Sequence, residues 1–116
     1  MPAMEQERPV IKLYFDEKSG SQETIKQVMY GIEEEGVPCD ASPASGSALT
    51  LAVEASRASR LEVGLGVDAV AVALHYSKLE PDAPLFQVHA KEDSERLRSI
   101  GANAARLVKK QPFKAL

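Results

Sequence analysis

The stretch EVGLGVDAVAVALHY, residues 62–76, decides the fold of this chain. It contains two apolar runs, residues 62–67 and 69–76, that are separated only by Asp68. Parallel neighbours need a crossover of about a dozen residues or more, whereas a tight turn is enough to join antiparallel strands. The stretch therefore predicts an antiparallel hairpin within a larger sheet.

The segments before the hairpin alternate between strand and helix patterns. VIKLYF, residues 10–15, is typical of a strand, and residues 37–41 predict a weaker second one. Between them, residues 23–35 carry apolar side chains at i, i+3, i+4 and i+7, which predicts one buried helix face, and Gly36 marks the helix end. Turn and N-cap chemistry for a second helix of about ten residues comes from Pro43, Ser45, Gly46 and Ser47.

After the hairpin, residues 85–89 predict a fifth strand and residues 93–109 a last helix with an apolar stripe. The order strand, helix, strand, helix, strand, strand, strand, helix predicts an α/β layered fold with mostly parallel strands. We expect one domain over residues 1–116, with flexible ends at 1–9 and 111–116.

Composition excludes several classes of function. With 44% hydrophobic and 27% charged residues, the chain is typical of a globular protein. A net charge of -3 and the absence of a basic cluster argue against nucleic acid as a partner. No apolar run approaches the roughly 20 residues of a membrane span, and the polar N-terminus does not resemble a signal peptide. The single cysteine, Cys39, excludes an internal disulfide, so we expect a cytoplasmic protein.

The residues with catalytic potential do not form a recognisable active site. His75 and His89 both lie in strand patterns without a second histidine or cysteine at metal-ligand spacing, so we expect solvated or hydrogen-bonded histidines. No nucleophile elbow, P-loop or dinucleotide fingerprint is present. Cys39 stands in an apolar context without a histidine nearby in sequence, which predicts an inert, half-buried thiol.

The unusual motif is GIEEEG, residues 31–36, which places three carboxylates in the last turn of the first helix. Negative charge there opposes the helix dipole, so intrinsic helix stability does not favour it. At about 100° per residue, Glu34 points almost opposite the apolar stripe, towards solvent or another chain. The motif is compatible with a solvated surface, or with one oxygen ligand of a hard cation such as Mg²⁺.

Four strings together resemble the small subunits of diol and glycerol dehydratase reactivating factors, a family related to the medium subunits of coenzyme-B12-dependent dehydratases. They are GIEEEGVP (31–38), VGLGVD (63–68), HYSKL followed by APLF (75–79 and 83–86), and NAARLVKKQPF (103–113). The resemblance implies three α/β/α layers around a five-stranded mixed sheet of order 2-1-3-4-5. As in anticodon-binding-like domains, strand 4 would be antiparallel.

The resemblance also implies a function without catalysis. Such a subunit pairs with an actin-fold, chaperone-like ATPase subunit and exchanges with the dehydratase medium subunit, so that damaged cobalamin leaves the dehydratase. ATP hydrolysis would belong to the partner subunit. The protein would be located in the bacterial cytoplasm, in some cases in association with a microcompartment. The isolated chain would hold no cofactor. The family's middle glutamate corresponds to Glu34, which would share a Mg²⁺ or Ca²⁺ with the large subunit.

Two other interpretations stay open at this point. The chain could be the medium subunit of a dehydratase itself, although those subunits usually carry a longer N-terminal extension and the first strand here begins near Val10. It could also be a solitary flavodoxin-like domain that binds a small ligand at the carboxyl edge of its sheet. Against the second, neither loop 16–21 nor loop 42–47 has the sequence of a phosphate cradle.

Overall fold

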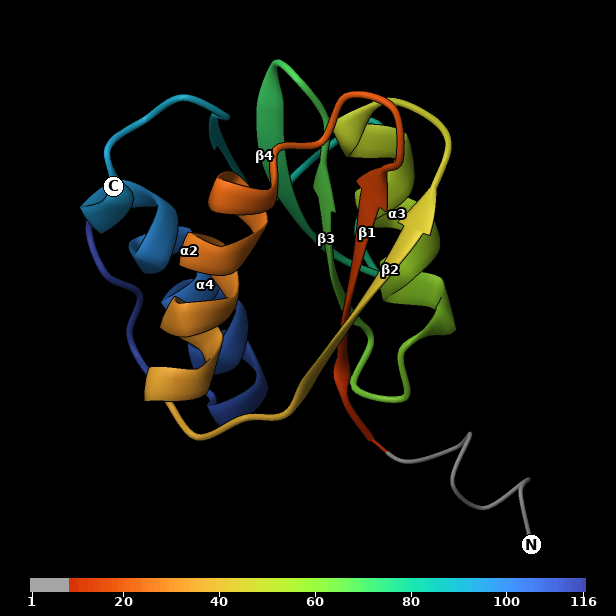
Figure 1. The fold of residues 1–116 in the computed structure, drawn as a ribbon. Helices are drawn as coiled ribbons and strands as arrows, with labels where there is room; N and C mark the ends of the chain where they lie inside the picture. The colour runs from red at the N-terminus through yellow and green to blue at the C-terminus, as the bar shows by residue number, and fades with distance from the viewer. Residues whose placement is uncertain (1–8) are drawn as a thin grey trace, which may run out of the picture.

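The computed structural model describes residues 9–116, which form one five-stranded mixed sheet between two helical layers (Figure 1). The strand order is β2-β1-β3-β4-β5. In chain order the elements are β1 (Ile11–Asp16), α2 (Gln22–Glu34), β2 (Cys39–Ala44), α3 (Ala48–Ala58), β3 (Val63–Val67), β4 (Ala71–Tyr76), β5 (Phe86–His89) and α4 (Ser94–Lys109).

The predicted hairpin is present and determines the mixed character of the sheet. β1 pairs in parallel with β2 and β3, whereas β4 is antiparallel to both β3 and β5. In the turn, Asp68 donates its backbone N–H to the Ala71 carbonyl at 3.1 Å. Its carboxylate also accepts from the N–H groups of Val70 and Ala71, each at 2.8 Å. The predicted sheet order and the antiparallel fourth strand are confirmed.

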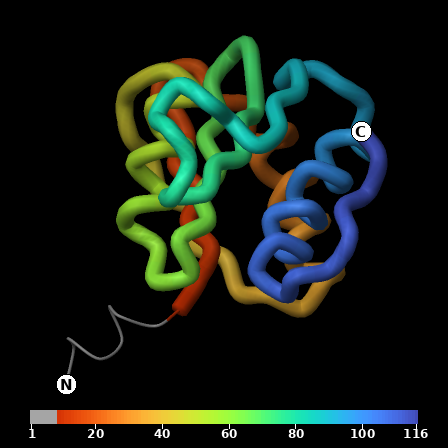
Figure 2. Tube along the Cα trace, turned by 180° about the vertical axis from the view of Figure 1, so that it is seen from behind, coloured from red at the N-terminus to blue at the C-terminus, as the bar shows by residue number. Residues whose placement is uncertain are grey.

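The helices cover the two faces of the sheet unequally. α3 lies on one face, and α2 packs beside α4 on the other, as the views from both sides show (Figures 1 and 2). The α2–α4 contact is close because each helix places a glycine against the other's backbone. A Cβ added to Gly31 would lie 1.9 Å from the Arg98 carbonyl oxygen, and one on Gly101 would lie 2.0 Å from that of Val28.

The second strand is present, but it begins and ends later in the chain than predicted. We predicted residues 37–41, but β2 runs from Cys39 to Ala44 and includes Pro43. The strand tolerates proline because it lies at the sheet edge. The Ala44 carbonyl faces β1 and accepts from the Glu17 N–H at 3.0 Å, so the backbone nitrogen of the preceding Pro43 points towards the open edge.

The two chain ends differ in what the structure describes. Residues 1–8 lie outside the described part of the chain, and with them most of the predicted flexible N-terminal end. Residues 111–116, the other predicted flexible end, turn back along α4, where Asn103 contacts the backbone of Lys114 (Figure 2). The flexibility of both ends stays a prediction. Within residues 9–116, no helix combines the length and the apolar character that a membrane span requires.

Candidate functional site at the end of helix α2

Helix α2 has a well-capped start and an acidic end. The Ser21 hydroxyl accepts from the Thr24 N–H at 3.3 Å and caps the first turn. The helix ends at Glu34, with Glu35 as the C-cap, and Gly36 follows at φ +80°, the left-handed conformation that favours glycine. We call Glu33, Glu34 and Glu35 the acidic turn. Because α2 has no basic residue in its last turn, charge compensation must come from another element.

Glu35 receives this compensation from α4. Its carboxylate accepts from Arg106 Nε and Nη2 at 3.2 and 3.1 Å and from Lys109 Nζ at 3.0 Å. Lys109 also donates to the Glu35 carbonyl oxygen at 2.7 Å, which satisfies one backbone acceptor at the helix end. The Lys109 and Arg106 hydrogen bonds hold the pKa of Glu35 below its usual range. Glu35 is therefore a structural link between the two helices.

Glu34 has the orientation predicted from helical periodicity. Its side chain is exposed, and among residues 9–116 no hydrogen bond or ion pair reaches it. Glu33 is exposed too and lies beside a groove of about 310 Å³ that Ile25, Met29 and Tyr30 also line. Two residues of the acidic turn therefore differ in role. Glu35 binds α4, whereas the Glu34 carboxylate faces the surroundings without a cationic partner among the described residues.

The residues around Glu34 provide only part of a metal site. No group of three or more His, Cys, Asp or Glu side chains among the described residues is placed to hold a metal ion. Mg²⁺ and Ca²⁺ take six or more oxygen ligands, of which one carboxylate supplies one or two. An exposed carboxylate without a partner suits a hard cation, but the remaining ligands must come from water or another molecule. The metal role of Glu34 stays a prediction.

The two histidines and the cysteine have the predicted environments, namely solvated or hydrogen-bonded imidazoles and a half-buried thiol. His75 is fully buried, with Nδ1 at 3.0 Å from Ser56 Oγ and Nε2 at 3.0 Å from the Glu80 carbonyl oxygen. Since a carbonyl only accepts, Nε2 carries a proton and His75 holds the loop after β4. His89 is exposed at the sheet edge. Burial, and then the carboxylates of Asp40 and Glu33, raise the pKa of Cys39 to about 12, so its thiol stays protonated.

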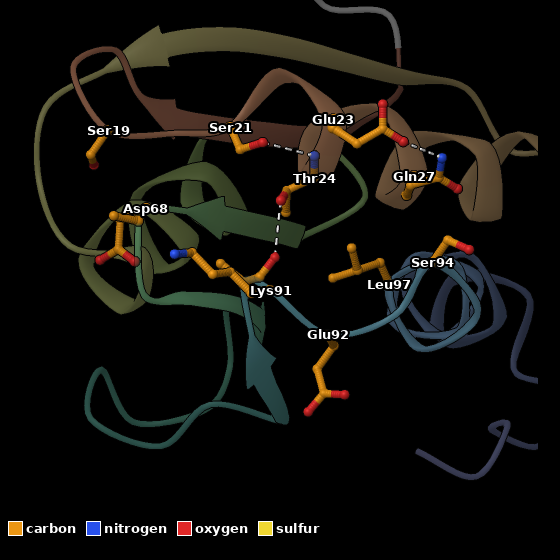
Figure 3. Close-up of a pocket in the computed structure, with 12 residues that line it drawn as sticks. Ser19, Ser21, Glu23, Thr24, Gln27, Asp68, Lys91, Glu92, Ser94 and Leu97 are labelled. Atoms are coloured by element: carbon orange, nitrogen blue, oxygen red, sulfur yellow. Dashed lines mark hydrogen bonds between the residues drawn. The ribbon is translucent and has the colours of Figure 1, made fainter.

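A pocket of about 320 Å³ lies at the carboxyl edge of the sheet, where the first turns of α2 and α4 meet the hairpin (Figure 3). Two of its polar side chains, Thr24 and Asp68, already serve the fold. Thr24 Oγ1 donates to the Ala90 carbonyl at 2.9 Å, and Asp68, besides closing the hairpin, accepts from the Ala48 N–H at 2.9 Å. Just outside, Asp16 accepts from Ser19 and Gly46. These carboxylates fix loops, and they would repel a phosphate.

Comparison with known proteins identifies the relatives of this fold. The family profile described as dehydratase medium subunit matches residues 8–114. The chain is 44% identical over 92 residues to the propanediol dehydratase-reactivating factor small subunit of Salmonella typhimurium (strain LT2), covering 78% of each chain. It is 34% identical over 108 residues to the probable glycerol dehydratase-reactivating factor small subunit of Citrobacter freundii, covering 90% of this chain and 92% of that one.

Two solved structures are similar over nearly the whole chain. One is described as glycerol dehydratase reactivase, with a TM-score of 0.89. The other is described as a diol dehydratase-reactivating factor complexed with ADP and Mg²⁺, with a TM-score of 0.82. Both are 36% identical to this chain, and the matches cover 92% of it and 97% of the other chain. The predicted resemblance and the predicted fold are confirmed.

Proposed function

Because the chain belongs to the dehydratase medium subunit family and resembles the small subunits of reactivating factors over most of its length, we propose that it is such a small subunit, a non-catalytic, chaperone-type protein that pairs with an actin-fold ATPase. The observation that carries the proposal is the match to a reactivase chain at TM-score 0.89 over 92% of the sequence. A TM-score of that size means that the two backbones follow the same fold over the matched length.

The absence of catalysis in this chain is inferred from how its reactive groups are used. Cys39 stays protonated, and His75 has both ring nitrogens in hydrogen bonds within the fold. Asp68 bonds backbone N–H groups of the hairpin and of α3. A relative is described as complexed with ADP and Mg²⁺. Because this chain has no phosphate-cradling sequence, we assign ATP binding and hydrolysis to the large subunit.

Glu34 is the residue that we assign to contact with the large subunit. Two features support it: the carboxylate is exposed without a partner in the described chain, and its neighbour Glu35 is anchored to Arg106 and Lys109. The anchor limits the motion of the turn that carries Glu34. We propose that Glu34 donates one oxygen to a Mg²⁺ or Ca²⁺ whose other ligands belong to the large subunit or to water.

The likeness to medium subunits supports an exchange mechanism on the dehydratase. A chain with the fold of a medium subunit can take that subunit's place against the rest of the enzyme. Binding of the reactivase would then shift the dehydratase towards a loosened state from which damaged cobalamin leaves and which intact coenzyme can enter. The energy for release would come from the differential affinity of the reactivase for the loosened state.

One experiment separates this function from the alternative of a dehydratase medium subunit, which the description of the family profile favours. The purified chain is added to inactivated holo-dehydratase with ATP, Mg²⁺ and fresh coenzyme, with and without the large ATPase subunit. We expect activity to return only when both are present. The proposal is wrong if the chain does not restore activity in the presence of the large subunit. The alternative is supported if the chain restores turnover to a dehydratase that lacks its medium subunit.

A further inference from the structure

The string NAARLVKKQPF, residues 103–113, joins α4 to the end of the chain, and the function proposed above gives it no role. Lys110 caps α4 in the left-handed conformation at φ 60°, and the Gln111 N–H donates to the Arg106 carbonyl at 2.9 Å. The chain therefore reverses and returns along the helix (Figure 2). We call residues 111–116 the C-terminal segment.

Asn103 holds the C-terminal segment by its backbone. Its side chain is fully buried: Nδ2 donates to the Lys114 carbonyl at 3.0 Å, and Oδ1 accepts from the Lys114 N–H at 2.6 Å. A buried amide without these two bonds would carry a large desolvation cost. Both bonds go to main-chain atoms of Lys114. The contact therefore fixes the position of the segment without depending on the Lys114 side chain.

Two further contacts, made by Phe113 and Leu116, hold the C-terminal segment against the rest of the fold. The ring of Phe113 meets that of Phe86 in β5 edge-on, with centroids 5.1 Å apart and planes at 90°. Leu116 packs against the main hydrophobic core. The segment thus spans from α4 to the edge strand of the sheet.

Arg106 connects the C-terminal segment with the acidic turn. Its Nη1 donates to the Pro112 carbonyl at 3.2 Å, while Nε and Nη2 donate to the Glu35 carboxylate. One planar guanidinium therefore bonds both partners at once, which a lysine ammonium could not do with the same geometry. The Arg106 side chain is 28% exposed and that of Glu35 16%, so both are partly shielded from water.

We propose that the C-terminal segment and Arg106 form a latch that holds the acidic turn in place. When the segment is seated, Pro112 and Glu35 together fix the guanidinium, and Glu35 in turn fixes the last turn of α2. When the segment leaves, Arg106 loses one bond and becomes more hydrated, so its pairing with Glu35 weakens towards that of an exposed ion pair. Arg106 is a positioning residue for the turn that carries Glu34.

Amide hydrogen exchange in the full chain, followed by NMR, tests the latch. The reporters are the N–H groups of Glu35 and Gly36, which donate to the carbonyls of Ile32 and Glu33 at 3.1 and 3.0 Å. In Asn103→Ala we expect both to exchange about three- to tenfold faster, the range for weakening one partly exposed charged contact. Amides in β3 and β4 should keep their wild-type rates.

Two arginine variants supply the matched comparison. Arg106→Lys keeps the charge but cannot bridge Pro112 and Glu35, so it should accelerate the same two amides even if Asn103→Ala fails to fold. Arg98→Lys is the control, because Arg98 also lies on α4 and bonds α2, through Gln27 Oε1 at 2.7 Å. Arg98 has no hydrogen bond to the described C-terminal segment, so Arg98→Lys should leave the Glu35 and Gly36 amides unchanged.

Either of two results would overturn the latch. In the first, the Lys114 amide of Asn103→Ala exchanges faster, showing release of the segment, while Glu35 and Gly36 keep their wild-type rates. In the second, all amides accelerate together, which shows only global destabilisation. The consequence for Glu34 rests on the proposed function: Asn103→Ala should also bind the large subunit several-fold more weakly. Failure of the wild type to bind would reject that function, whereas the exchange rates would still test the latch.

Discussion

Replacing Glu34 with alanine tests the proposed contact most directly, because the structure separates its effect on folding from its effect on assembly. The side chain is exposed and no described residue pairs with it, so the substitution should change the free energy of unfolding by no more than about 0.5 kcal/mol. Loss of a negative charge at the C-terminal end of α2 should act in the stabilising direction, by about 0.3 kcal/mol.

The effect on assembly should be much larger. A charged ligand interaction is worth about 1.5–3 kcal/mol, which corresponds to an affinity for the large subunit that is about ten- to a hundredfold lower in Glu34→Ala. The assay is titration calorimetry of each variant against the large subunit, with Mg²⁺ and with chelator. Wild type should bind more weakly in chelator, whereas Glu34→Ala should bind weakly in both conditions.

Glu33→Ala is the matched control for this titration. It removes the same charge one residue away, and its side chain lies about 100° round the helix, beside the groove with Met29 and Tyr30. It should keep the metal dependence of the wild type. Equal affinities of wild type and Glu34→Ala in both Mg²⁺ and chelator would refute the metal role, and an equal loss in Glu33→Ala would show that only overall charge matters.

Three further predictions follow from other parts of the structure. The Lys109 and Arg106 contacts lower the pKa of Glu35, so they stabilise the fold fully at pH values above the usual carboxyl pKa of 4.5, and this stabilisation is lost as the pH falls through the lower pKa of the folded state. In urea unfolding between pH 7 and 3, the free energy of unfolding should therefore decline less in Glu35→Gln than in the wild type. Gly31→Ala should lower the melting temperature by at least about 5 °C in calorimetry despite alanine's helix propensity, since its Cβ meets the Arg98 carbonyl, and an unchanged value would contradict the close helix contact. The isolated chain should give no binding heat with ATP, and micromolar affinity would contradict the assignment of nucleotide binding to the partner.

The sequence predicts the parts of this structure that depend on local patterns. The short connection at Asp68 excludes a crossover, and for that reason the antiparallel fourth strand could be predicted. Helical periodicity likewise gives the outward direction of Glu34. The position of β2 could not be predicted, because Pro43 disfavours a strand except at a sheet edge, and edge position depends on the assembled sheet.

The partners of Glu35 lie beyond what local patterns can show. Arg106 is 71 residues away in sequence and Lys109 is 74, and the two cations meet Glu35 only because α2 and α4 pack closely through their glycines. The sequence does contain a signal, since three carboxylates against the helix dipole require compensation from outside α2. It does not indicate that one carboxylate is compensated within the fold while Glu34 is left to the surroundings.

Pro43 in the edge strand also bears on how this protein behaves between partners. An open sheet edge with regularly spaced donors is a template on which another chain can add a strand, and the result is aggregation. Pro43 offers no donor on the open side of β2, so an added strand would lose a hydrogen bond there. Under the proposed exchange mechanism, the subunit would be without a partner after it leaves one complex and before it joins the next. We therefore expect Pro43 to disfavour strand addition at this edge during that interval.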